Sequence, residues 1–104
     1  MIANDLTPAY PTHPGEVVRD EIEFLEISQK TLAGVIDVPY KVLNEVLNAR
    51  RPLSAEMALK LEAALDIPAA TLLGLQTKYN LYNVSRDSRV SELLQRIRRI
   101  AATL

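Results

Sequence analysis

The chain has 104 residues, the size of a single small domain. It has no cysteine and one histidine, which excludes disulfides, thiol catalysis and metal sites built from cysteines or several histidines, and we expect no cofactor. The formal net charge of −1, taken alone, argues mildly against nucleic-acid binding. The apolar runs are too short to span a membrane, and the lack of a charged-then-apolar leader favours a cytoplasmic location.

Residues 1–12 contain Pro8 and Pro11 and show no periodicity, which predicts a flexible N-terminal arm. Beyond them, apolar residues recur at helical spacing and no β pattern is visible, so we expect an all-α fold. The helix start and stop signals predict five helices, at about 14–25, 29–36, 40–47, 55–65 and 68–79. Ser28 and Ser54 are the expected N-caps of the second and fourth of these helices.

The polar stretch 80–87 predicts a connection to a last helix, which begins at Ser88 or Ser91 and runs to the end of the chain. The apolar residues of this helix form one stripe, and arginines occupy the rest of its surface. The stripe has three interpretations: it closes the domain's own core, pairs with its counterpart across a two-fold axis, or docks a partner protein. We favour dimer or partner contact, through Leu93, Leu94, Ile97 and Ile100.

The net charge conceals an uneven distribution. Residues 13–83 carry seven basic and ten acidic side chains, whereas residues 84–104 carry five arginines and two acids. Acidic residues concentrate in the first predicted helix, and a local basic patch surrounds the third. Because phosphate binding depends on where charge lies more than on its sum, DNA binding stays open.

The segment 27–51 carries the most specific chemistry, because it predicts two short helices joined by a tight turn around a small apolar core. The expected core residues are Leu32, Ala33, Ile36, Val38, Leu43 and Leu47. This is the arrangement of a helix-turn-helix, whose second helix enters the major groove of DNA. The side chains able to contact bases or phosphates are Gln29, Lys30, Tyr40, Lys41, Asn44, Arg50 and Arg51.

Within this group, Asn44 is suited to adenine, and Lys41 to guanine or phosphate. Gln29 and Lys30 begin the second helix, where free N–H groups favour a phosphate, and Arg50 and Arg51 are placed to grip the backbone. Two further residues of the third helix are less clearly assigned. Tyr40 is either a groove contact or a lid on the core, and Glu45 either accepts from cytosine or is silent, since a carboxylate repels phosphate.

Several motifs recur in the order found in a known family. They are His13-Pro14-Gly15-Glu16, Ser28-Gln29-Lys30 with Leu32-Ala33, Leu47-Asn48-Ala49-Arg50-Arg51-Pro52, Ser54-Ala55-Glu56-Met57-Ala58-Leu59, and Leu75-Gln76 with Tyr79-Asn80-Leu81. Over about residues 13–81 the chain resembles HigA-type antitoxins of bacterial toxin–antitoxin operons, which belong to the Cro/C1-type (XRE) helix-turn-helix class. The resemblance implies a homodimeric, five-helix, lambda-repressor-like DNA-binding domain over 13–81, and leaves 82–104 as a connection and C-terminal helix.

The chain departs from the family at two turn positions. Asp37 stands where a glycine is usual between the second and third helices, a mild change because aspartate tolerates the left-handed conformation. Ala49 replaces the usual glycine after the third helix. It either keeps a positive φ at a cost of about 1 kcal/mol, or sends the loop with Arg50 and Arg51 along a different path.

Two groups of residues suggest catalysis only weakly. His13 is interpreted as a helix-entry residue rather than a catalytic one. Asp20, Glu21 and Glu23 resemble paired carboxylates for acid–base chemistry, but the pattern places them on an exposed helix with no pocket implied. We therefore do not expect an enzyme.

The function implied by the resemblance is a sequence-specific repressor that binds a palindromic operator in double-stranded DNA and represses its own toxin–antitoxin operon. It would also neutralise a HigB-type toxin, a ribosome-dependent mRNA endonuclease. Two alternatives remain. One is an antitoxin that acts mainly by binding the toxin, with weak DNA binding, in which the acidic first helix meets a basic toxin. The other is a stand-alone XRE-type regulator without a toxin.

Overall fold

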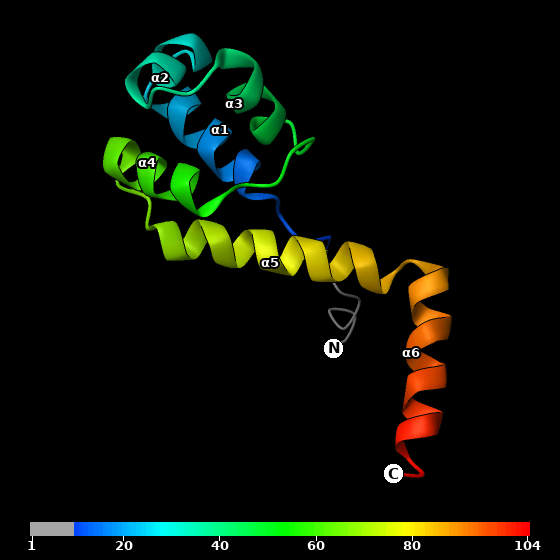
Figure 1. The fold of residues 1–104 in the computed structure, drawn as a ribbon. Coiled ribbons are helices and arrows are strands. Elements are labelled where there is room, and N and C mark those ends of the chain that lie inside the picture. The colour runs from blue at the N-terminus through cyan, green and yellow to red at the C-terminus, as the bar shows by residue number, and fades with distance from the viewer. Residues whose placement is uncertain (1–9) are drawn as a thin grey trace, which may run out of the picture.

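The computed structural model describes residues 10–104, so most of the predicted N-terminal arm lies outside the described residues. The described part contains six helices and no strand, which confirms the all-α prediction. The helices are α1 (Pro14–Phe24), α2 (Gln29–Val35), α3 (Tyr40–Leu47), α4 (Ala55–Leu65), α5 (Ala69–Ser85) and α6 (Ser88–Ala101). Figure 1 shows α1 to α4 gathered on one side of the long α5, with α6 leading away from its far end.

Short polar side chains begin three of the helices, as local capping rules require. Ser28 accepts a hydrogen bond from the Thr31 N–H, and Ser54 accepts one from the Met57 N–H, which confirms both predicted N-caps. Asp87 accepts from the backbone of the first turn of α6 and fixes the start of that helix at Ser88.

The predicted connection at 80–87 was wrong, because α5 continues to Ser85 and only residues 86–87 separate it from α6. The Asn80 side chain, which suggested a loop, accepts a hydrogen bond from Gln76 Nε2 one turn earlier, at 2.9 Å. Tyr79 and Tyr82, also one turn apart, both pack edge-on against the ring of Tyr10. These contacts hold the last turns of α5 in helical form despite their polar sequence.

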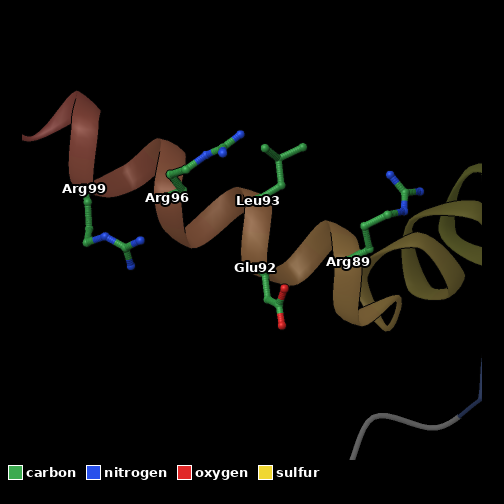
Figure 2. Close-up of a pocket in the computed structure, with 5 residues that line it drawn as sticks. All are labelled: Arg89, Glu92, Leu93, Arg96 and Arg99. Atoms are coloured by element: carbon green, nitrogen blue, oxygen red, sulfur yellow. The ribbon is translucent and has the colours of Figure 1, made fainter.

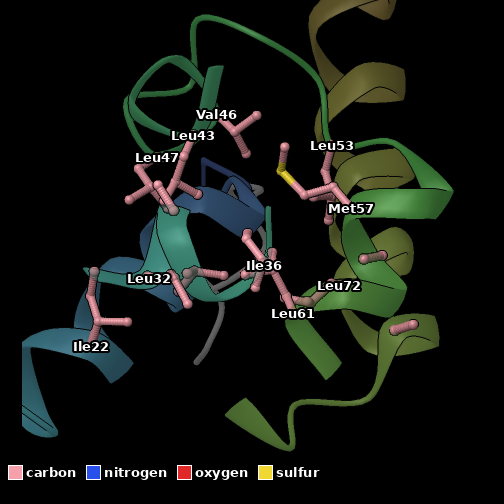
Figure 3. Close-up of a cluster of buried hydrophobic side chains, with 14 residues drawn as sticks. Ile22, Leu32, Ile36, Leu43, Val46, Leu47, Leu53, Met57, Leu61 and Leu72 are labelled. Carbon is pink, nitrogen blue, oxygen red and sulfur yellow. The ribbon is translucent and has the colours of Figure 1, made fainter. Parts of the chain in front are cut away.

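One apolar core lies between α1 to α4 and the first half of α5 (Figure 3). The buried residues of this core are Val18, Ile22, Leu32, Ala33, Ile36, Leu43, Val46, Leu47, Leu53, Met57, Ala58, Leu61, Ala69 and Leu72. All six residues expected in the helix-turn-helix core belong here, with Val38 packed at its edge and the other five buried. The core therefore fixes α3 through its inner face and leaves the outer face of α3 free.

The start of α1 packs directly on the backbone of α3. An added Cβ on Gly15 would lie 2.1 Å from the carbonyl oxygen of Val46 and 2.9 Å from the Cα of Leu47. No residue larger than glycine fits there without separating the two helices. Pro14 and Gly15 are both buried, so the His-Pro-Gly-Glu motif forms the surface of α1 against which the C-terminal end of α3 packs.

Four helices end in left-handed residues that are not glycine. Glu26, Asp37, Ala49 and Asp66 have φ values of 58°, 55°, 59° and 60°. After each of the first three, a backbone N–H bonds back to the third-last helical carbonyl, as in the bond from Arg50 N to Glu45 O at 2.8 Å, which is the Schellman arrangement. Ala49 thus keeps the positive φ that glycine usually supplies, and the alternative loop path is not taken.

The last helix stands apart from the core, since no residue of α6 is buried. Leu93, Leu94, Ile97 and Ile100 expose between 37% and 57% of their surfaces. Closure of the domain's own core, the first of the three interpretations of the stripe, therefore does not describe this structure. Within residues 10–104, no helix combines the length and apolar character needed to cross a membrane.

Candidate nucleic-acid interface

The candidate interface is built on the N-terminus of α2 and the outer face of α3. A hydrogen bond of 2.9 Å joins them, from Asn44 Nδ2 on α3 to Gln29 Oε1 on α2. Both residues are half-buried. The bond fixes the orientation of the two amides, and leaves Oδ1 of Asn44 and Nε2 of Gln29 as a neighbouring acceptor and donor.

Lys30, Tyr40 and Lys41 flank this amide pair and are exposed. Lys30 lies in the first turn of α2, where backbone N–H groups and the helix dipole add to its positive charge. Tyr40 is the first residue of α3 and exposes 52% of its surface, which favours an outward-facing contact over a lid on the core. Lys41 follows on the next position of the same exposed turn.

The two arginines after α3 have different surroundings. Arg51 donates from Nε and Nη2 to Glu45 Oε1, at 3.0 and 2.7 Å. The hydrogen bonds and charge of Arg51 lower the pKa of Glu45 below its ordinary value, so this carboxylate stays ionised. Arg50 is exposed and has no side-chain hydrogen bond or ion pair within residues 10–104. Of the two, Arg50 is therefore the one available to a phosphate without first breaking an ion pair.

Two residues that support α3 were not predicted from the sequence. Arg19 of α1 donates from Nη1 to the carbonyl oxygen of Leu47 at 3.3 Å and to Oδ1 of Asn48 at 3.2 Å. It places a positive charge where the carbonyls of α3 end, which stabilises that terminus. Arg19 is separated from Leu47 and Asn48 by 28 and 29 residues along the chain, so no local sequence pattern indicates these contacts.

Gln76 of α5 holds the loop that leaves α3. It is buried, and its Oε1 accepts a hydrogen bond of 2.8 Å from the backbone N–H of Leu53. Its Nε2 donates to Asn80, so both ends of the amide are satisfied. Gln76 belongs to the motif Leu75-Gln76 with Tyr79-Asn80-Leu81, and this recurrence could have identified it as a structurally important residue.

His13 is a structural residue, as predicted. Its Nδ1 accepts a hydrogen bond of 2.9 Å from the Gly15 N–H, while Glu16 Oε2 accepts from the His13 N–H, and together these form a capping box. The ring lies edge-on to Tyr79 of α5, with 4.8 Å between centroids. Burial lowers the pKa of His13, so the neutral ring that accepts the Gly15 hydrogen is the favoured form.

One hollow of the surface, of about 500 Å³, is bounded by residues of α6 alone, namely Arg89, Glu92, Leu93, Arg96 and Arg99. Figure 2 shows their side chains pointing in different directions around one helix, with no opposing wall. Within residues 10–104, no group of three or more acidic, histidine or cysteine side chains is arranged to hold a metal ion.

The sequence and structure match known helix-turn-helix proteins. Residues 24–72 match the helix-turn-helix family. The HTH-type transcriptional regulator YbaQ of Escherichia coli is 32% identical over 95 residues, which are 90% of this chain and 84% of YbaQ. The Pseudomonas aeruginosa antitoxin HigA, solved with the higBA promoter, superposes with a TM-score of 0.73 at 30% identity, covering 83% of this chain and 92% of HigA. Pseudomonas aeruginosa PA4674, solved with its 18-bp operator DNA, gives a TM-score of 0.66 at 35% identity over 71% of this chain and 81% of PA4674.

The protein is thus a DNA-binding regulator rather than an enzyme. It belongs to the helix-turn-helix family and is of the HigA antitoxin type. This membership confirms the resemblance and the fold class predicted from the sequence. Family membership therefore gives no reason to assign a catalytic role to the carboxylates Asp20, Glu21 and Glu23 on α1.

Proposed function

We propose that the protein binds a palindromic operator as a homodimer, with α3 of each copy in the major groove. The observation that carries this proposal is the half-buried amide pair of Gln29 and Asn44, held in fixed orientation by its hydrogen bond and accompanied on α2 and α3 by the exposed cations Lys30 and Lys41. The similarity to HigA and PA4674, each solved with its own promoter or operator DNA, supports it. The two-fold symmetry of a dimer would match half-sites about 34–36 Å apart.

Each residue of the interface has a proposed role. Asn44 and Lys41 read base edges, and Gln29 acts with Asn44 as one unit because their side chains are bonded. Tyr40 contacts the groove wall. Three cations serve the phosphates: Lys30, Arg50 and, when released from Glu45, Arg51.

We also propose how the chain is divided among these tasks. Residues 13–81 form the DNA-binding unit, the arm at 1–12 precedes it, and residues 82–104 provide dimer or partner contact through Leu93, Leu94, Ile97 and Ile100. The exposure of these four apolar side chains on α6 supports the last assignment.

The operon-level role follows from the type of protein. We propose that the chain represses its own toxin–antitoxin operon and neutralises a HigB-type toxin. Five acidic side chains on and just after α1 offer a negative surface for a basic RNA-cleaving toxin: Glu16, Asp20, Glu21, Glu23 and Glu26. An antitoxin that mainly masks its toxin, and a stand-alone regulator, are the competing functions.

A mobility-shift assay on the protein's own promoter region tests the proposed docking. We expect Lys41→Ala and Arg50→Ala each to lower affinity about tenfold or more, because each removes a cation from the interface. Lys78→Ala removes an exposed cation from α5 and serves as the matched control, with unchanged binding expected. Wild-type affinity in both interface variants would rule out this docking.

Co-expression separates the three operon-level functions. A small basic reading frame next to this one, toxic alone and harmless with this chain, supports the antitoxin. Rescue by a chain carrying both Lys41→Ala and Arg50→Ala would show that neutralisation does not need DNA binding. Promoter repression without any such reading frame would leave the stand-alone regulator.

A further inference from the structure

Glu45 is the one acidic residue of α3. It lies one turn after Lys41 and directly follows Asn44, the two residues proposed to read bases. Its side chain is 28% exposed, and Nε and Nη2 of Arg51 both donate to its Oε1, at 3.0 and 2.7 Å. The hydrogen bonds from Arg51, with the charges of Arg51, Lys41 and Arg50, hold the pKa of Glu45 below its ordinary value. An ionised carboxylate therefore lies within the surface that is proposed to meet DNA.

The ion pair of Glu45 with Arg51 is not needed to hold the loop after α3. That loop is already fixed at its start by the bond from Arg50 N to Glu45 O, at 2.8 Å. Further along, the backbone N–H of Leu53 donates to the buried Gln76, also at 2.8 Å. An ion pair as exposed as this one, with 48% of the Arg51 side chain accessible, contributes little to stability. Glu45 is thus better explained by its effect on DNA binding than by its effect on the fold.

For DNA in general, Glu45 is unfavourable in two ways. Its charge repels phosphates, and its ion pair occupies Arg51, one of the three cations proposed to bind them. Neither effect depends on the base sequence. A duplex that offers nothing in return therefore meets an interface with one cation engaged and one charge opposed to binding.

Some bases can compensate a carboxylate in the major groove. Cytosine and adenine present amino groups there that donate hydrogen bonds, whereas guanine O6 and N7 and thymine O4 are acceptors. A carboxylate only accepts, so it fits the first two bases on the strand that it faces and is repelled by the acceptors of the other two. We propose that Glu45 is a specificity-determining residue, which accepts a hydrogen bond from such an amino group in the operator and there releases Arg51 to a phosphate. On other sequences the ion pair persists and binding is weaker.

The choice of glutamate rather than glutamine is central to this role. A glutamine amide has both a donor and an acceptor, so it adapts to any of the four bases, and without a charge it would leave Arg51 free on every duplex. Glutamate lowers the affinity for all DNA and regains it only at a matching base. It therefore widens the difference in affinity between the operator and other sequences.

This inference rests on the proposed operator binding, and one titration series measures both. Fluorescence anisotropy gives the Kd of the full chain for the operator, located by footprinting on the protein's own promoter region, and for an unrelated duplex of equal length. Glu45→Gln should tighten both complexes, and the unrelated one about tenfold more, since a good base contact discriminates by about that factor or more. Glu92→Gln removes the same charge from an exposed position on α6 and should leave the ratio of the two Kd values unchanged. An unchanged ratio in Glu45→Gln would overturn the proposal.

The salt dependence tests the exchange of Arg51 between Glu45 and phosphate. On unrelated DNA, Lys30 and Arg50 are the two phosphate contacts of each copy, so log affinity should fall against log salt with a slope of about −3.6 for a dimer. On the operator, the released Arg51 raises the contacts of the dimer to six and the slope to about −5.4. Glu45→Gln should give the steeper slope on both duplexes, because Arg51 is then free on either. Equal slopes of the wild type on the two duplexes would refute the exchange.

Single base-pair substitutions across the operator locate the base that Glu45 meets. For the wild type, inverting the base pair at one position of each half-site should weaken binding about tenfold or more, because an acceptor then replaces the amino group. Glu45→Gln should lose most of this discrimination at that position and keep it where Asn44 and Lys41 read. If Glu45→Gln relaxes no position, or all positions alike, Glu45 reads no base and the proposal is wrong.

The inference and the proposed function can fail separately. If the wild type prefers its operator and Glu45→Gln changes both affinities by the same factor, operator recognition stands and Glu45 has no part in it. If the wild type shows no preference for its operator over the unrelated duplex, both proposals are refuted.

Discussion

Replacing Gly15 by alanine tests whether α3 is held by direct backbone contact with α1. The new Cβ would lie 2.1 Å from Val46 O, whereas ordinary contacts begin at about 3.4 Å, so the helices must separate by roughly 1 Å. Overpacking of this kind costs about 1–3 kcal/mol, and a backbone oxygen has less room to yield than a side chain. We therefore expect a loss near 3 kcal/mol, which for a domain of this size lowers Tm by roughly 12–24 °C.

The other two glycines provide matched controls. An added Cβ on Gly34 or Gly74 meets nothing within 4 Å. Both lie inside helices, so Gly34→Ala and Gly74→Ala should raise stability by up to about 1 kcal/mol through helix propensity alone. Urea unfolding followed by circular dichroism compares the three variants. A midpoint for Gly15→Ala equal to those of Gly34→Ala and Gly74→Ala would refute the close-packing argument.

Three further substitutions examine other parts of the structure. Burial lowers the pKa of His13, so folding favours the neutral form of its ring. The resulting contribution to stability is complete above the unfolded pKa of 6.5 and is lost as the pH falls through the lower folded pKa. His13→Asn keeps a capping side chain but removes this titration, so its urea midpoint should depend less on pH between 7 and 5 than that of the wild type. Ala49→Gly relieves the strain of the positive φ of 59° and should stabilise the folded domain by about 1 kcal/mol in the same urea assay. An unchanged midpoint would contradict the assigned strain. Glu45→Gln releases Arg51 and removes a carboxylate from the interface, so fluorescence anisotropy should show operator affinity several-fold above wild type, whereas Glu23→Gln on α1 should leave it unchanged.

The parts of the fold that depend on neighbouring residues could be predicted from the sequence. The bounds of α3 and α4 and the caps at Ser28 and Ser54 follow from signals within one helical turn. The end of α5 could not be predicted in this way, because its polar last turns are held by the ring of Tyr10. Local propensity favours a loop there, and the tertiary contact outweighs it.

The candidate site shows the same division between local and distant causes. The exposed positions of Tyr40 and Lys41 follow from helical periodicity once the core face of α3 is known. The ion pair of Arg51 with Glu45 and the bond between Gln29 and Asn44 depend on side-chain conformations that periodicity does not specify. They alter the expected chemistry, since one arginine is partly neutralised and two amides act together.

The salt dependence of operator binding measures how many of the proposed cations contact phosphate. Lys30, Arg50 and Arg51 supply three phosphate contacts per copy and six per dimer, so the logarithm of affinity should fall with the logarithm of salt concentration with a slope of about −5.4. Arg50→Ala removes one contact per copy and should reduce the slope to about −3.6. A slope for Arg50→Ala equal to that of the wild type would mean that Arg50 does not contact phosphate.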